Sequence, residues 1–398
     1  MNEVSSHVKL NKVESSSKND IKYLLEVGNK QYFVGELIYF IIIQLQAKNT
    51  LEKISIDVNL KFKPDALLTG SDIQDIVNNN IKPLGVFEYN YDESKINTSV
   101  KAKITLLSAK TINRICSPIK YLFSPLSFFT ITLFLVLLNL YFVFWTENPL
   151  IKFDYSSGGI ITYLLIYPIL IIITLIHELG HSAATLKFNV QPKSIGFGFY
   201  YLLPVLYTDI SGIWRLSKMK KVIINLAGIY MQLLANGLIF ITTLFLRNNL
   251  ITNFLHYIVL ANFSIIIINL LPFIKYDAYW IYSDLSGINN LQSKSIKFLK
   301  ETFSRIIRNE NIDIKKIKTS LIVYSIFRLT FFIIIYYFIL KAFISEIRDF
   351  HVFLEILKYF NFSSLTIFYI IRVLFLYTFG FAVIYSLIKM VLARFLKL

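Results

Sequence analysis

Six long apolar runs constrain the fold of this chain more than any other feature of its sequence. They cover residues 128–145, 158–186, 222–246, 251–271, 321–344 and 365–389. A helix of about 20 apolar residues crosses the hydrocarbon core of a bilayer, and each run approaches or exceeds that length. Hydrophobic residues make up 55% of the 398 residues, more than soluble domains usually contain. The sequence therefore predicts a mostly α-helical, polytopic membrane protein with about six transmembrane helices.

The positions of the basic residues predict the orientation of these helices. Lysine and arginine clusters lie before the first run, after the second, before the third, after the fourth, before the fifth and after the sixth. If the six helices cross alternately, all these clusters share one side of the membrane, and basic loops mark the cytoplasmic side. We therefore expect a multi-pass protein of the cell membrane with cytoplasmic N- and C-termini. Because the basic residues flank apolar runs, the net charge of +16 indicates the lipid bilayer, and no nucleic acid, as the partner.

The N-terminal quarter of the chain is its most hydrophilic organised part. Residues 1–19 are polar and of mixed charge, which predicts a disordered or loosely held tail. The pattern that follows predicts strands at 23–27 and 31–34, helices at 36–46, from 50 and at 72–79, and an extended stretch at 86–91. This order indicates a small winged-helix-like α+β domain over residues 20–91. The sequence leaves open whether this domain is a binding module or a structural cap.

Two local patterns support the helices of this domain. Ile54, Val58 and Leu60 are expected on the apolar side of the second helix. Ser71, followed three residues later by Gln74, has the form of a capping box and predicts the start of the third helix.

The segment His177-Glu178-Leu179-Gly180-His181 lies at the end of the second apolar run. Histidines four residues apart on a helix lie about 40° apart around its axis, so both imidazoles project from one face. Neutral imidazole is a good zinc ligand, and a neighbouring carboxylate can take a proton from a water that the metal activates. This is the His-Glu-x-x-His pattern of zinc metalloproteases. The single cysteine, Cys116, excludes an intrachain disulfide and a cysteine-based zinc site.

Asp277 is the candidate third ligand, because a catalytic zinc ion needs three protein ligands and one open position. The fourth run crosses from outside to inside, so Asp277 emerges on the same face as the histidines. A carboxylate at that depth, beside Tyr276 and Trp280, is costly unless a metal or a charged partner holds it. The alternative is an ordinary solvated loop aspartate next to Lys275.

The two segments together resemble the site-2 protease family of intramembrane zinc metalloproteases. In that family, a His-Glu-x-x-His helix is followed by a later segment that reads Asn-x-x-Pro, a few apolar residues and Asp-Gly. Here the later segment is Asn269-Leu270-Leu271-Pro272 followed by Asp277, with Ala278 in place of the usual glycine. Asp209 lacks this context and ranks below Asp277 as a ligand.

The resemblance implies a role for each matching residue. It implies that Zn²⁺ is the cofactor, that Glu178 activates the water, that Asn269 lines the substrate site, and that the metal ligands are His177, His181 and Asp277.

Residues 193–216 and 225–230 resemble a group of bacterial peptide zinc metalloproteases more closely. These enzymes are encoded beside genes for ribosomally made, modified peptides, and they begin with a domain similar to the PqqD-like winged helix that binds leader peptides. This resemblance spans roughly residues 20–290. It implies that residues 20–91 bind a leader peptide and that the substrate is a peptide or a membrane protein.

Residues 196–207 alternate aromatic residues with small or apolar ones, which predicts a re-entrant hairpin beside the motif helix. An exposed edge of this hairpin could pair with an extended substrate by strand addition. The alternative is a re-entrant loop that only packs against helices.

The remaining charged positions within apolar runs are not expected to be catalytic. Arg328 and Arg372 are expected either to face a cavity or partner, or to extend their charge to the membrane surface. His7, His256 and His351 are expected to lie away from the metal site, the last two as ordinary surface histidines.

The motifs predict an intramembrane zinc metalloendopeptidase, and the resemblance implies that it hydrolyses a membrane-associated or leader-bearing peptide in the maturation of a ribosomally made, modified peptide. Two alternatives remain open: a regulatory protease that cuts a transmembrane anti-sigma factor, and a non-catalytic immunity or export membrane protein. The expected organisation is a tail at 1–19, the winged-helix-like cytoplasmic domain at 20–91, a connector at 92–121 and a transmembrane metalloprotease domain at 122–398.

Overall fold

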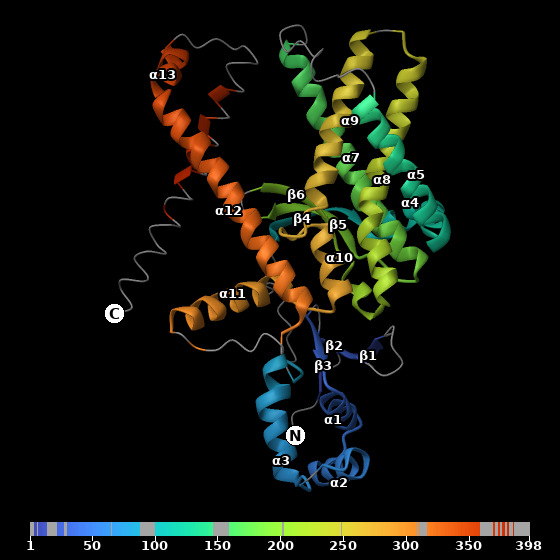
Figure 1. The fold of residues 1–398 in the computed structure, drawn as a ribbon. Helices are drawn as coiled ribbons and strands as arrows, with labels where there is room; N and C mark the ends of the chain where they lie inside the picture. The colour runs from blue at the N-terminus through green and yellow to red at the C-terminus, as the bar shows by residue number, and fades with distance from the viewer. Residues whose placement is uncertain are drawn as a thin grey trace. The chain divides into compact units, whose positions relative to one another are not determined.

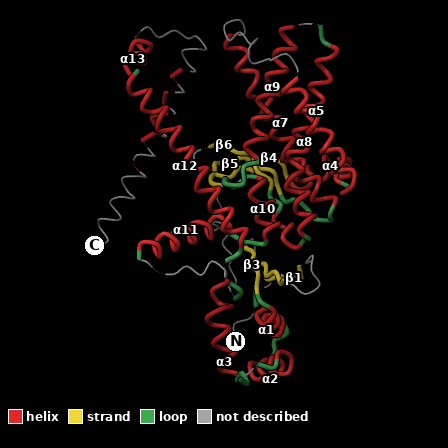
Figure 2. Tube along the Cα trace, in the orientation of Figure 1, coloured by secondary structure: helices red, strands yellow, loops and turns green. Residues whose placement is uncertain are grey.

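The computed structural model is mostly helical (Figures 1 and 2). Its contacts divide it into two units. It describes residues 4–5, 7–13, 22–27, 30–64, 66–87, 100–145, 159–200, 203–247, 249–308, 310, 317–358 and parts of 369–385. The first unit contains residues 1–134 and 174–231, and the second contains 135–173 and 232–398. The domain boundaries predicted at 91 and 121 both fall inside the first unit.

A three-stranded antiparallel sheet forms the start of the first unit, in the order β1 (Val8–Val13), β2 (Lys22–Val27) and β3 (Lys30–Val34). The hairpin predicted over residues 23–34 is confirmed, with Leu25 opposite Tyr32. The prediction of a disordered or loosely held tail is wrong for residues 8–13, which pair with β2. Val8 and Leu10 alternate with polar residues, so this strand adds its apolar face to the core, where Val8 is buried.

Three helices complete the core beneath this sheet: α1 (Glu36–Gln46), α2 (Leu51–Phe62) and α3 (Gly70–Ile76). The first has the predicted bounds, and the second begins one residue after its predicted start, with Thr50 as its N-cap. Ile54 and Val58 are buried as expected, but Leu60 is 71% exposed. Residue 60 lies about 200° around the helix from residue 58, so the two cannot share a face.

The third helix begins two residues earlier than predicted. Its capping box is formed by Thr69 and Asp72, not by Ser71 and Gln74. The Thr69 hydroxyl accepts from the Asp72 amide, and the Asp72 carboxylate accepts from the Thr69 amide. The Thr69 hydroxyl also donates to the Asp72 carboxylate over 2.7 Å, and this hydrogen bond, together with the one from the Thr69 amide, lowers the pKa of Asp72.

The helical segment continues through η1 (Val77–Ile81) and η2 (Lys82–Leu84). Residues 86 and 87 then form a turn, so the predicted extended stretch is wrong there, and its residues 88–91 lie outside the described residues.

A second antiparallel sheet has the order β4 (Val100–Ser108), β5 (Ser194–Tyr200) and β6 (Leu203–Thr208). The strands predicted over 196–207 are confirmed as the β5–β6 hairpin, while its insertion into a membrane stays a prediction. The segment 92–121, expected to be a connector, instead contributes β4 and the helix α4 (Ala109–Ile119). Lys103 is tolerated in β4 because its side chain is exposed while the strand pairs with β5.

Five helices among the described residues are long and apolar enough to cross a membrane. They are α5 (Pro125–Trp145), α7 (Gly159–Lys187), α8 (Lys218–Phe245), α9 (Asn249–Asn269) and α12 (Thr319–Arg348). They match the first five predicted spans. The sixth, at 365–389, falls largely on residues that the structure does not describe.

Buried amides join three of these helices within the second unit. Gln232 donates to Asn262, Asn262 to Asn236, and Asn236 to Asn139, each over 2.8 Å. The four side chains are at most 2% exposed. Since these helices have apolar surroundings, the amides are satisfied mainly by one another and by helix carbonyls, which links α5, α8 and α9.

Three shorter helices belong to the second unit: α10 (Asp277–Ser286), α11 (Leu291–Ile307) and α13 (Phe350–Lys358). Gly287, at φ 64°, ends α10 in the left-handed conformation that favours glycine. Tyr279, Leu291 and Tyr324 form a buried cluster that packs α10 and α11 against α12.

Candidate metal centre

The two motif histidines lie near the C-terminal end of α7 and are buried. His177 is 5% exposed and His181 is 6% exposed. Their four-residue spacing brings the two Nε2 atoms to 3.0 Å from each other. Two imidazoles on a mainly apolar helix are thus oriented toward a common point, as two ligands of one ion must be.

The backbone of α8 sets the tautomer of His181. The Nδ1 atom of His181 lies 2.7 Å from the carbonyl oxygen of Ile224. A carbonyl can only accept, so Nδ1 carries the proton and donates, and neutral His181 keeps its lone pair on Nε2. This is the outer hydrogen bond that orients histidine ligands in metal sites.

Two glycines bring α7 and α8 close together at this point. A Cβ atom at Gly180 would lie 2.6 Å from the carbonyl oxygen of Ala227. A Cβ atom at Gly228 would lie 2.5 Å from Cε1 and Nε2 of His177 and 2.6 Å from Nε2 of His181. The imidazoles therefore occupy the space that a side chain at residue 228 would fill. Sequence reasoning missed this role, although residues 225–230 stood out by their resemblance to the peptide metalloproteases.

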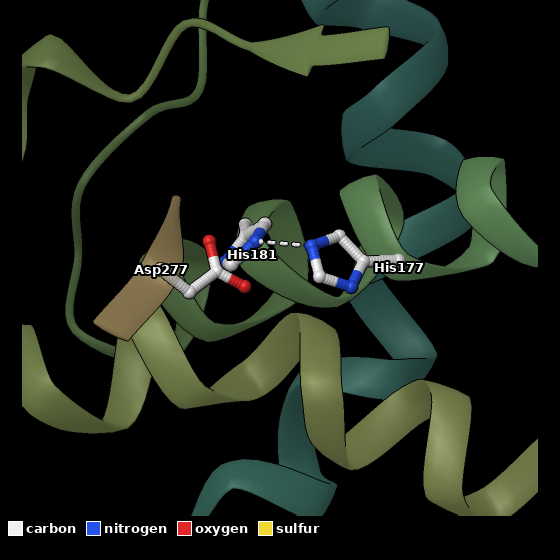
Figure 3. A group of neighbouring side chains, drawn as sticks. All are labelled: His177, His181 and Asp277. Atoms are coloured by element: carbon white, nitrogen blue, oxygen red, sulfur yellow. Dashed lines mark hydrogen bonds between the residues drawn. The ribbon is translucent and has the colours of Figure 1, made fainter. Parts of the chain in front are cut away.

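Asp277, the first residue of α10, supplies the third potential ligand. One ligand atom from each of His177, His181 and Asp277 lies within 4.8 Å of the other two, and Figure 3 shows the carboxylate and the rings gathered together. This is the one such group of three or more His, Cys, Asp or Glu residues among the described residues. The predicted ligand set is therefore brought together and could bind a metal.

The donor set fits zinc. Two neutral imidazoles and one carboxylate leave one position of a tetrahedral ion open, as catalytic zinc sites require. Nitrogen ligands at zinc bond lengths would lie roughly 3.3 Å apart in a tetrahedron. The observed separation of 3.0 Å between the two Nε2 atoms is close to that value.

Glu178 lies beside the ligands and is held by a different contact. It is 8% exposed, and the hydroxyl of Thr208 donates to its Oε2 atom over 2.6 Å. The same hydroxyl lies 3.1 Å from the Glu178 carbonyl oxygen. Thr208 ends β6, so the second sheet positions the carboxylate. Sequence reasoning missed Thr208, because no local pattern connects it to a residue 30 positions earlier.

Cys116 packs behind the motif. Its thiol on α4 donates to the carbonyl oxygen of Leu179 over 3.6 Å, and burial raises the pKa of the thiol to about 12. The cysteine therefore supports the motif helix and is not a ligand.

The other predicted positions lie in varied surroundings. Asn269 is half-buried and donates to Gln232 over 3.5 Å, and its role toward a substrate stays a prediction. Asp209 accepts from the Ser211 amide in a local turn. Arg328 lies over the ring of Phe332.

Within the part of the chain that the structure describes, neither His256 nor His351 belongs to the ligand group. His256 contacts Phe142 and Thr243 and is half-buried, so the prediction of an ordinary surface residue is wrong. His351 is exposed, and Arg372 lies outside the described residues.

Comparisons with protein-family models, with curated proteins and with solved structures find no match to this chain. The fold and the site by themselves define a class: a helical protein with membrane-type helices and a candidate centre of two histidines and one aspartate.

Proposed function

We propose that this chain is an intramembrane zinc metalloprotease of the site-2 protease type, acting on a membrane-associated or leader-bearing peptide. The observation that carries the proposal is the convergence of His177, His181 and Asp277 with Glu178 buried beside them. Three ligands alone would suit a structural or transport site. An adjacent carboxylate that is held by a hydroxyl, and is not itself in the ligand group, is what hydrolysis needs in addition.

A zinc ion held by these ligands would supply Lewis-acid chemistry, polarising a peptide carbonyl and acidifying water. Glu178 accepts the proton of the attacking water and later delivers it to the leaving amine. Thr208 holds the Glu178 carboxylate in place for both transfers. The Ile224 carbonyl keeps the His181 ring in its ligating tautomer.

The substrate must reach this site with its backbone extended, because the peptide bonds of a helix are shielded. β6 is an edge strand that ends at Thr208, so a peptide added along it would run toward Glu178. β3 is an edge strand of the N-terminal sheet, which suits capture of a leader segment by residues 20–91. Both features favour an extended peptide as the substrate, and we extend the proposal to a peptide supplied from the cytoplasm, in the maturation of a ribosomally made, modified peptide.

The test measures zinc content and peptide cleavage on the purified full-length protein. Glu178→Gln is expected to keep zinc and to lose cleavage by about 10²–10⁴-fold, since it removes the general base. Asp277→Asn is expected to lose zinc and cleavage together. Asp209→Asn is the matched control, because Asp209 lies near in sequence to Thr208 but its carboxylate caps a local turn, and it should keep the wild-type zinc content.

The outcomes separate the alternatives. The purified wild-type protein is tested on a panel of peptides that includes any peptide precursor encoded by a neighbouring gene. If it contains zinc but shows no cleavage that a chelator abolishes, a non-catalytic immunity or export protein is favoured. Cleavage of a transmembrane anti-sigma factor, but not of leader-bearing peptides, would favour a regulatory protease. Unchanged cleavage by Glu178→Gln would refute the mechanism itself.

A further inference from the structure

The helix α11 (Leu291–Ile307) has two distinct faces. Its C-terminal half carries exposed apolar side chains on one side. Phe303, Ile306 and Ile307 are 62%, 58% and 58% exposed. Ile296, about two turns before Phe303 on the same side, is 38% exposed. At about 100° per residue, these four side chains fall within a sector of roughly 100°. We call them the apolar strip.

A separate, narrower part of α11 attaches it to the rest of the second unit. Leu291 and Ser295 are fully buried, and Leu291 packs with Tyr279 and Tyr324. The backbone amide of Gln292 also donates to the Tyr279 hydroxyl. Because these contacts hold the N-terminal half of the helix, the apolar strip is not needed for its docking.

The exposed surface of α11 outside the apolar strip is strongly basic, with Lys300 at the edge of the strip and the other basic residues on the far side. Between residues 291 and 308 there are five basic side chains and one acidic side chain, Glu301; the basic ones are Lys294, Lys297, Lys300, Arg305 and Arg308. All five are exposed. Lys297 lies 3.7 Å from Glu301, so one charge is partly offset and most of the positive potential remains. This combination of a basic face and an apolar strip fits an anionic lipid surface.

The position of α11 in the chain matches such a surface. It lies between the candidate spans α9 and α12, and it is not itself among the candidate spans. Figure 1 shows α11 lying across the direction of α12. A helix that crosses the direction of a neighbouring span lies along the membrane surface when that span is upright.

We propose that α11 is an interfacial helix that binds anionic lipid headgroups, with the apolar strip in the boundary between headgroups and acyl chains. Its lysines and arginines then lie beside the lipid phosphates. This contact fixes the second unit in the plane of the bilayer at the end of α12. The proposal does not depend on metal binding or on proteolysis.

The test places a fluorescent probe on each face of α11 in the full-length protein, reconstituted at one copy per nanodisc. Phe303→Cys puts the probe on the apolar strip, and Ser304→Cys is the matched control, because residue 304 lies about 100° further around the helix. The native Cys116 is buried and leaves the introduced thiol as the labelling site. Quenching by aqueous iodide is compared with quenching by a nitroxide attached near the lipid headgroup.

In discs that contain about 30% phosphatidylglycerol, iodide should quench the probe at residue 304 at least about threefold more strongly than the probe at residue 303. The lipid nitroxide should quench the probe at residue 303 more strongly than the probe at residue 304. The charge-removing pair Lys297→Gln and Lys300→Gln should reduce the shielding at residue 303 by about twofold, as should purely zwitterionic discs. Equal iodide access at both residues would overturn the proposal. So would shielding at residue 303 that appears only with two copies per disc, because it would assign the apolar strip to a second copy of the chain.

Discussion

Gly228→Ala adds one methyl group, and the structure predicts that it removes the metal site. The new Cβ would lie 2.5 Å from the ring of His177, whereas an ordinary contact needs at least 3.4 Å. The imidazole must therefore move by about 1 Å, or α7 and α8 must separate by a similar distance. Metal–ligand distances vary by only about ±0.2 Å. After either movement, the two Nε2 atoms can therefore no longer bind the same ion. We expect zinc affinity to fall at least about 100-fold, the upper end of the losses caused by changes around metal ligands.

The assay is zinc per chain after equilibrium dialysis against buffered zinc, together with the thermal unfolding midpoint of the same samples. Gly237→Ala on the same helix is the matched control. Its Cβ would lie 3.4 Å and 3.6 Å from the side chains of Leu138 and Leu135, close to ordinary contact distance. Both variants gain the same helix propensity, because glycine in a helix interior costs up to about 1 kcal/mol relative to alanine. A difference in zinc content between them therefore reports the space around the histidines.

Wild-type zinc affinity in Gly228→Ala would refute this reasoning, since it would mean that the imidazoles have room that the structure denies them. Loss of zinc in both variants would also count against it, because the effect would then follow from any alanine in α8. A lower unfolding midpoint in Gly228→Ala alone, with zinc removed from both samples, would show that the added methyl separates the helices.

Three further predictions concern the surroundings of the site. Thr208→Val should lower kcat by about 10- to 100-fold with zinc content unchanged, because a hydrogen bond to a charged group contributes about 1.5–3 kcal/mol. Thr208→Ser keeps the hydroxyl and should keep kcat close to the wild-type value. An equal loss of kcat in both variants would contradict the positioning of Glu178 by this hydroxyl. Asn262→Leu should destabilise the protein by about 1–3 kcal/mol in detergent unfolding, because it leaves buried amide partners unsatisfied, whereas Ser264→Ala on the exposed side of α9 should have little effect. Cys116 should not react with a maleimide at pH 8, because burial raises the pKa of its thiol to about 12, and labelling should appear only on unfolding or as the pH approaches that value; rapid labelling of the folded protein at pH 8 would contradict this.

Hydropathy and one short motif predicted most of the framework. A bilayer leaves few options for a run of about 20 apolar residues, so the first five spans were found within a few residues of their observed ends. The His177 and His181 pair follows from helix geometry alone, because four residues are close to one turn. Asp277 could be predicted as the third ligand because the Asn269–Pro272 segment that marks it lies only a few residues earlier in the chain.

The missed features depend on contacts between segments far apart in the chain. β4 has the composition of a polar connector and becomes a strand only because β5, some 90 residues later, pairs with it. Similarly, nothing around Thr208 predicts that it contacts Glu178. The strand at residues 8–13 was not predicted because three apolar residues in a polar segment are a weak signal until a partner strand is present.

Gly228 and Ile224 together show how the backbone of a mainly apolar helix can organise a candidate metal site. They lie one turn apart on α8, and in an α-helix the carbonyl of residue 224 also accepts from the amide of residue 228. That carbonyl retains a second lone pair, and His181 donates to it. The missing side chain at residue 228 leaves the room that both imidazoles occupy. One turn of backbone therefore sets both the tautomer of one ligand and the separation of the pair. A larger residue at 228 must disturb both histidines at once, even though it changes neither ligand.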